Sequence, residues 1–319
     1  MGRQTPEESL KVFAARAVRK RLAGLTREIP GVREASDPEA VHRMRVASRR
    51  LRSALEVFGG CFPPRSVRQW NRQMRSLRRA LGAARDTDVR IEFLDSLLQT
   101  VEDPGVRPGI ERLILRQRQL RDEEQRHVLR ALERLRSSGV TAEMKQALRA
   151  MGSEQSPRAR SEAARSILPR LDALLALEPC VHRPGQTAEH HSMRIAAKRL
   201  RYTVEIFEPL FADRLTGAIA ALRTLQDMLG EIHDCDVWSE WLPVFEAEER
   251  ERTLSYLGSD EAMRALIPGL KFVREERQAR RRQSFSEFAA FWASLRRDGV
   301  FDALRTAIEP GSGASATSD

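Results

Sequence analysis

The sequence has few aromatic residues and few of the residues that interrupt helices. Of its 319 residues 6% are aromatic, with only 18 Gly and 15 Pro. Sandwiches of β-sheets need aromatic and β-branched residues in their strands and Gly and Pro in their turns, so this composition argues against that class. We therefore expect an all-α protein built from long helices.

Cysteine and long apolar runs are also scarce. Cys61, Cys180 and Cys235 are odd in number and never form a Cys-x-x-Cys pair, which predicts reduced thiols and neither a disulfide framework nor a zinc site. No run approaches the roughly 20 apolar residues of a membrane span, and the first residues lack the apolar core of a secretory signal. We expect a cytoplasmic protein with no membrane partner.

Lysine is rare although the chain is strongly basic. Its 55 Lys and Arg exceed its 45 Asp and Glu, which gives a formal net charge of +10. Five of these basic residues are Lys, so fifty are Arg, whose planar fork of donors fits phosphate oxygens. A GC-rich genome would produce the same bias, so the positions of the arginines have to decide.

Hydrophobic periodicity predicts helices along nearly the whole chain. A cap at Ser36-Asp37 with Pro38 in the first turn begins a helix that ends near Phe58. The other predicted helices span 7–29, 65–84, 86–101, 107–137, 141–151, 158–177, 187–208, 213–233, 235–248, 259–283 and 284–308. A linker at 152–157 separates two halves, 1–152 and 153–308, and 309–319 is expected to be a disordered tail.

The second half repeats two motifs of the first. Residues 42–58 match residues 191–207 at nine of seventeen positions with an offset of 149. A Leu-x-x-x-Leu-Gly motif within 77–89 recurs within 225–237 at an offset of 148. Two motifs in the same order at nearly the same spacing indicate an internal duplication, and hence two related helical halves.

Each repeated helix separates on a helical wheel into an apolar face and a basic face. The first basic row is His42, Arg45, Arg49 and Arg52, and the second is His191, Arg194, Lys198 and Arg201. Like charges at this spacing repel, and a merely solvated face normally mixes both signs. A polyanion that neutralises both rows explains them better. The two histidines have two open explanations, phosphate contact or fixing a helix end.

More arginines follow the first basic row. Between His42 and Arg85 the chain has twelve Arg and one acid, Glu56. The next helix carries Arg68, Arg72, Arg75 and Arg79 on one side, and Arg75 has a basic counterpart at Arg223, whereas Arg79 aligns with Asp227. We add Arg75, Arg79 and Arg223 to the candidate binding residues, together with Tyr202, the aromatic residue next to a row.

The repeated Leu-Gly motif carries glycines and acids. Gly82 and Gly230 lie inside helical patterns, where Gly costs about 1 kcal/mol relative to Ala, so they indicate a close helix approach or a bend. Four aspartates are expected to cap the next helix or to brace arginines of the rows. They are Asp86, Asp88, Asp234 and Asp236.

A metal site is the weaker alternative. His233-Asp234 is similar to the metal-binding pair of HD phosphohydrolases, but Arg85 takes the place of His233 in the first half. Further ligands at a suitable spacing are missing. The phosphate-loop, dinucleotide-binding and nucleophile-elbow motifs are also missing, so we expect no catalytic residues, no metal and no cofactor.

These motifs together resemble the CHAD domain, the conserved histidine α-helical domain. The resemblance rests on His42-x-x-Arg45-x-x-x-Arg49-Arg50-x-Arg52 and Leu81-Gly82-x-x-Arg85-Asp86, and on their second-half equivalents, across about residues 5–305. It implies two four-helix-bundle-like halves related by a pseudo-twofold axis. It also implies a basic surface or pore that binds inorganic polyphosphate, with Arg50 and Arg199 joining the two basic rows, and an association with polyphosphate granules.

Three functions follow in order of preference. The first is non-catalytic binding of long-chain inorganic polyphosphate. The second is binding of a nucleic-acid backbone, which the basic rows would also suit, although they lack the interleaved aromatics that stack bases. The third is a metal-dependent polyphosphate or nucleotide phosphohydrolase that uses the aspartates.

Overall fold

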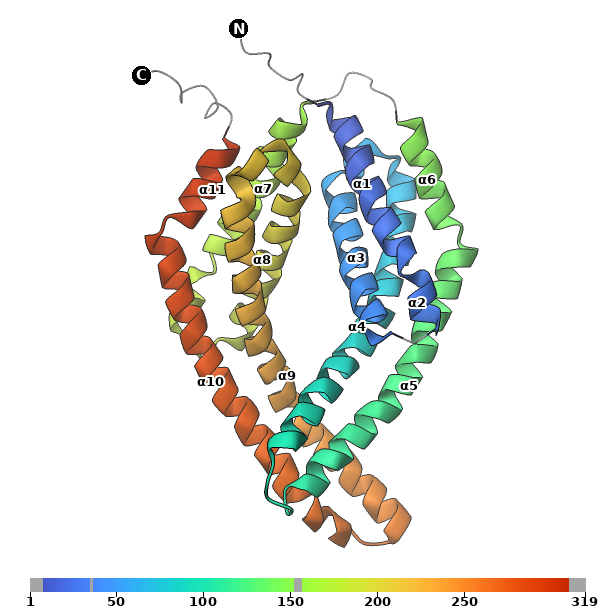
Figure 1. The fold of residues 1–319 in the computed structure, drawn as a ribbon, viewed down its shortest axis with the longest axis vertical. Helices are drawn as coiled ribbons and strands as arrows, with labels where there is room; N and C mark the ends of the chain where they lie inside the picture. The colour runs from blue at the N-terminus through green and yellow to red at the C-terminus, as the bar shows by residue number, and fades with distance from the viewer. Residues whose placement is uncertain (1–7, 35–36, 152–156, 310–319) are drawn as a thin grey trace.

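The computed structural model describes residues 8–34, 37–151 and 157–309, and within them the fold is all-α, as predicted (Figure 1). The first half of the chain forms α1 (Leu10–Arg27), α2 (Ile29–Glu34), α3 (Pro38–Val57), α4 (Pro64–Thr100), α5 (Arg107–Ser137) and α6 (Val140–Ala150). The second half forms α7 (Ala159–Leu175), α8 (Thr187–Phe207), α9 (Thr216–Leu257), α10 (Ile267–Arg297) and α11 (Val300–Ile308).

Local sequence signals explain several helix ends. The Asp37 side chain accepts a hydrogen bond of 2.9 Å from the Glu39 backbone N–H, and Pro38 occupies the first turn of α3, as predicted. Helices α6 and α11 each follow a glycine in the left-handed region, Gly139 with φ 65° and Gly299 with φ 64°. A side chain is strained in that conformation, so both turns favour glycine.

Several predicted helix boundaries are wrong. The predicted breaks at 84–86 and 233–235 do not exist, because α4 and α9 run through them without interruption. The predicted break at 283–284 lies further on, at Asp298 and Gly299, and the predicted helix 7–29 ends at Arg27, with α2 following from Ile29. In α4 and α9 the buried leucines continue on both sides of the glycine, so tertiary packing outweighs its low helix propensity.

The helices of the two halves follow the same order and make contact at both ends of the molecule. Figure 1 shows α1–α6 on one side, α7–α11 on the other, and the long helices crossing at the bottom. At the opposite end Phe13, Phe58 and Phe207 form an aromatic cluster, with ring centroids 5.7–5.9 Å apart. Beside it Ser9 and Arg158 form an isolated antiparallel bridge. These two residues are 149 positions apart, the offset of the sequence repeat.

A pair of glycines lies where the long helices cross. A Cβ atom on Gly109 of α5 would stand 2.3 Å from the Leu266 carbonyl oxygen, and one on Gly269 of α10 would stand 2.3 Å from the Val106 oxygen. The two helices therefore touch through backbone atoms. A second hydrophobic core, which includes Leu94, Ile110, Trp238 and Leu270, surrounds this crossing.

Some predictions fall on residues that the structure does not describe. Residues 152–156 of the predicted linker and residues 310–319 of the predicted tail lie outside the described residues. The boundaries at 152 and 308 remain predictions. In the part of the chain that is described, no helix is long and apolar enough to cross a bilayer.

Candidate functional site

The two basic rows lie on α3 and α8, which pack against each other. Burial lowers the pKa of Lys198 on α8 to about 7, and the positive charges of Arg194, Arg49 and Arg45 act in the same direction. Two of those charges belong to α3, so cations of both rows lie within electrostatic range of one another. We call these four residues, Arg45, Arg49, Arg194 and Lys198, the shared cluster.

Arg45 and Arg194 occupy equivalent settings in the two halves. The Nε atom of Arg45 lies 3.9 Å from the Cβ position of Gly82, and Nε of Arg194 lies 3.9 Å from that of Gly230. Each repeated glycine thus faces a guanidinium group and not the backbone of a neighbouring helix. Burial lowers the pKa of both arginines, that of Arg45 to about 10, and both remain charged at neutral pH.

The motif aspartates divide into two pairs. Asp88 accepts a hydrogen bond of 2.6 Å from Nε of Arg121 on α5, and Asp236 accepts one of 2.5 Å from Nε of Arg281 on α10. These contacts tie α4 to α5 and α9 to α10. All four aspartates lie inside α4 or α9, so none of them caps a helix as proposed from the sequence.

The other two aspartates face the shared cluster. Asp86 forms an ion pair of 3.3 Å with Arg45, and its side chain is 61% exposed. Asp234 acts electrostatically on Arg194 without forming an ion pair. Arg49, Arg194 and Lys198 form no ion pair with any carboxylate of the described residues, so the shared cluster keeps most of its positive charge.

The end of the second basic row is more neutralised than the shared cluster. Arg201 forms an ion pair of 3.2 Å with Glu205 and donates to Oε1 of Gln226 at 3.1 Å. Its guanidinium lies 4.8 Å from the ring centroid of Tyr202, which is only 5% exposed. Tyr202 also interacts electrostatically with Arg45 and Arg194. Arg201 and Tyr202 therefore support the cluster from a buried position.

The histidines supply hydrogen-bonding groups and little charge. Nδ1 of His191 lies 3.2 Å from Nδ1 of His233. Burial and the charges of Arg194 and Lys198 lower the pKa of His191, and burial and Arg85 lower that of His42. The buried Nδ1 of His42 has no partner in the described part of the chain. A neutral imidazole with an unused nitrogen is suited to a hydrogen bond with a ligand.

The arginines of α4 extend the site. Arg75 and Arg79 are exposed and share the face of α4 that carries Gly82, and Arg52 at the end of the first row stands near this face. Sequence reasoning missed Arg78 on the same face. Burial lowers its pKa, and the charges of Arg52 and Arg49 act with burial. Arg78 was missed because the one-sided row of Arg68, Arg72, Arg75 and Arg79 does not include it; its position four residues before Gly82 was the available signal.

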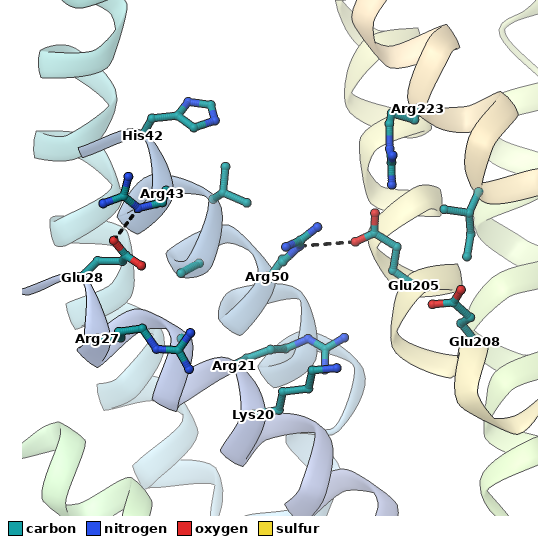
Figure 2. A pocket seen from close by; sticks show the side chains of 14 residues that line it. Lys20, Arg21, Arg27, Glu28, His42, Arg43, Arg50, Glu205, Glu208 and Arg223 are labelled. Carbon is teal, nitrogen blue, oxygen red and sulfur yellow. Dashed lines mark hydrogen bonds and ion pairs between the residues drawn. The ribbon is translucent and has the colours of Figure 1, made fainter. Parts of the chain in front are cut away.

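Two cavities flank the contact between α3 and α8. The first cavity, of about 620 Å³, is lined by residues that include His42, Arg50 and Arg223 (Figure 2). The second cavity, of about 500 Å³, is lined by residues that include Arg199. Arg50 and Arg199 thus point into the two cavities, and Arg50 forms an ion pair of 3.4 Å with Glu205 across the first.

The described residues offer no obvious metal site. Among residues 8–34, 37–151 and 157–309, no group of three or more His, Cys, Asp or Glu side chains is arranged to hold a metal ion. Asp88 and Asp236 are engaged by arginines, and His233 faces another histidine. Most of the charged side chains at the site are cations.

The fold and the shared cluster define a helical protein whose two halves present cations to a common surface. The chain belongs to the CHAD domain family, whose model matches residues 16–243. This confirms the resemblance seen in the sequence. No match was found among curated proteins.

Two solved structures are similar in fold. One is the CHAD domain from the plant Ricinus communis, with 23% sequence identity and a TM-score of 0.71, covering 92% of this chain and 93% of that chain. The other is PptA from Streptomyces chartreusis, with 15% identity and a TM-score of 0.64, covering 90% of this chain and 100% of that chain.

Proposed function

We propose that this protein binds long-chain inorganic polyphosphate through the shared cluster and does not catalyse a reaction on it. Some members of the CHAD domain family bind polyphosphate. The observation that carries the proposal for this chain is a set of cations from both halves, Arg49, Arg194 and Lys198, none of which forms an ion pair with a described carboxylate. A polyanion bound there would remove their mutual repulsion. The same function would bring the protein to polyphosphate granules in the cytoplasm.

The energetics favour a polymer over a single phosphate. A charge-assisted hydrogen bond to an anion contributes roughly 1.5–3 kcal/mol. A linear polyanion that contacts many cations also releases its condensed counterions, as nucleic acids do. A short chain reaches fewer of the cations on α3, α4 and α8 at once. Affinity is therefore expected to rise with chain length.

Nucleic acid fits the site less well. Proteins that bind single strands stack bases on exposed aromatic rings, whereas Tyr202, the aromatic residue beside the rows, is 5% exposed and covered by Arg201. A phosphohydrolase would use the four motif aspartates, but three of them, Asp86, Asp88 and Asp236, form ion pairs with arginines. Both alternatives are tested as outcomes below.

Calorimetric titration with polyphosphates of defined length tests the proposal. The variant Arg49→Ala/Arg194→Ala/Lys198→Ala removes three cations that form no ion pair and should lower the affinity for a long chain by about 1,000-fold, since three contacts of about 1.5 kcal/mol each are lost. The control Arg126→Ala/Arg130→Ala/Arg134→Ala removes three exposed cations from α5 and should keep its affinity within about twofold of the wild type. Unchanged affinity in the first variant would contradict the proposal.

Competition and product assays separate the alternatives. At matched salt, polyphosphate should displace labelled single-stranded RNA and duplex DNA, and neither nucleic acid should displace polyphosphate at equal phosphate concentration. The reverse order would favour the nucleic-acid function. Release of free phosphate from polyphosphate, stopped by EDTA, would favour the phosphohydrolase.

A further inference from the structure

The first cavity is strongly cationic. Six cations and three carboxylates line it, which leaves three positive charges in excess. Figure 2 shows Lys20, Arg21 and Arg27 on one wall and Arg223 on the other. Lys20, Arg27 and Arg223 are exposed and form no ion pair with a described carboxylate. The cavity therefore offers cations that the fold itself does not use.

The carboxylates of this cavity are already engaged or lie on one side. Glu28 pairs with Arg43 at 2.8 Å, and Glu205 pairs with Arg50 at 3.4 Å. Glu208 lies beside Glu205 on the wall opposite α1 and α3 (Figure 2). An anion in the cavity would consequently follow the wall formed by α1 and α3.

The first cavity adjoins the shared cluster through His42. This residue lines the cavity, and the positive charges of Arg45 and Arg49 act on its ring together with burial. The buried Nδ1 atom of His42 has no partner among the described residues. A chain that leaves the cluster past His42 would enter the first cavity.

The second cavity has the same framework with less charge. Val46, Ala47 and Arg50 of the first cavity correspond, at the offset of 149, to Ile195, Ala196 and Arg199 of the second. The charged positions differ, because the equivalents of Lys20, Arg27 and Arg43 are Pro169, Ala176 and Ser192. The second cavity has two cations, Arg170 and Arg199, and one carboxylate, Glu56, which pairs with Arg170 at 3.4 Å.

We infer that the first cavity is a second anion subsite, which takes the part of a linear polyphosphate chain that extends beyond the shared cluster, and that the second cavity takes none. This inference rests on the proposed function and adds the direction in which the bound chain runs from the shared cluster. The charge difference between two cavities of matched framework carries it. A bound chain then leaves the protein along α1, past Lys20 and Arg27.

Two polyphosphates and two variants test the inference. The short chain is chosen from a length series as the shortest whose binding is weakened by Arg49→Ala/Arg194→Ala/Lys198→Ala. The cavity variant Lys20→Ala/Arg27→Ala should bind this short chain within about twofold of the wild type and should bind a long chain about tenfold more weakly, because two exposed phosphate contacts on the α1 wall are lost. Circular dichroism should be unchanged, since both side chains are exposed.

The controls distinguish failure of the inference from failure of the function. The charge-matched variant Arg126→Ala/Arg130→Ala should bind both lengths as the wild type does. Adding the missing charges to the second cavity, by Ala176→Arg/Ser192→Arg, should tighten binding of the long chain only. Unchanged long-chain affinity in the cavity variant, or equal losses for both lengths, would overturn the inference alone. Absence of binding by the wild type would overturn the proposed function itself.

Discussion

The Nδ1 atoms of His191 and His233 lie 3.2 Å apart, so one imidazole donates its proton to the other. Protonating both rings would place two cations in contact beside Arg194. Burial lowers the pKa of His233 to about 4, and the charges of Arg194, His191 and Lys198 act in the same direction. The pair is therefore neutral at pH 7, and the arginines and Lys198 carry the charge of the site.

The neutral state of His233 makes the stability of the fold depend on pH. As the pH falls from about 6.5 towards 4, the unfolded chain binds a proton on His233 that the folded chain does not, so the free energy of unfolding falls. At pH 5 this effect reaches about 2 kcal/mol. Urea unfolding of the wild type and of His233→Gln, at pH 7 and pH 5, should show a smaller loss in the variant. Equal losses in both proteins would show that His233 titrates normally.

Lys198 makes the affinity for polyphosphate depend on pH in the neutral range. Its pKa of about 7 means that the free protein loses this charge as the pH rises, whereas a bound phosphate stabilises the charged form. Affinity should fall by about tenfold between pH 6 and pH 8, with proton uptake on binding at the higher pH.

The control for Lys198 is a side chain that remains charged. Lys198→Arg should bind with an affinity that is nearly constant over this range, because a guanidinium does not titrate there. Calorimetry in two buffers of different ionisation enthalpy measures the protons taken up. A pH dependence as steep in Lys198→Arg as in the wild type would assign the effect to another group.

The sequence predicted those features that local pattern controls. The cap at Asp37, the bounds of α5 and α8 and the apolar and basic faces of the repeated helices follow from residue spacing within one helix. Because the motif occurs twice, the two basic rows were expected to bind one polyanion together. In the structure this expectation takes a specific form, with Arg45 beside Gly82 and Arg194 beside Gly230.

Features that depend on contacts between distant segments could not be predicted. Breaks were predicted after residues 84 and 233, next to the repeated Leu-Gly motif, but apolar residues buried on both sides continue α4 and α9. Nothing in the sequence around Glu205 indicates that its carboxylate pairs with Arg50, which lies 155 positions earlier in the chain. The Pro-Gly pairs at 108–109 and 268–269 can be read from the sequence, but the contact between Gly109 and Gly269 depends on the crossing of α5 and α10.

Gly109 and Gly82 should respond differently to the same substitution. In Gly109→Ala the new Cβ atom would stand 2.3 Å from the Leu266 carbonyl oxygen, so the crossing of α5 and α10 has to open. We expect a loss of about 3 kcal/mol in the free energy of unfolding.

In Gly82→Ala the nearest atom is Nε of Arg45 at 3.9 Å, an ordinary contact, and the better helix propensity of Ala should stabilise the protein by about 0.5–1 kcal/mol. Thermal and urea unfolding measure both, and a destabilised Gly82→Ala would mean that the guanidinium needs more room.

Glu205 should stabilise the fold and weaken the binding of polyphosphate. Its carboxylate pairs with Arg50 of α3 and Arg201 of α8, and it also lines the first cavity. Glu205→Gln keeps the shape but removes the charge. The free energy of unfolding should fall by about 1–2 kcal/mol, because the contact between the halves loses a half-buried ion pair. Affinity for long polyphosphate should rise by about threefold or more, since Arg50 is freed and a negative charge is removed beside the bound chain.

The matched control for Glu205 is Glu56, its equivalent in the first half. Glu56 lines the second cavity, pairs with Arg170 at 3.4 Å and is 52% exposed. Glu56→Gln should lower stability by less than about 1 kcal/mol, because the pair is exposed to solvent. It should leave affinity unchanged, because the second cavity holds no ligand. If Glu205→Gln instead weakens binding, the carboxylate orients Arg50 and Arg201 towards the polyphosphate. Its main effect is then to position these arginines, and not to repel the polyanion.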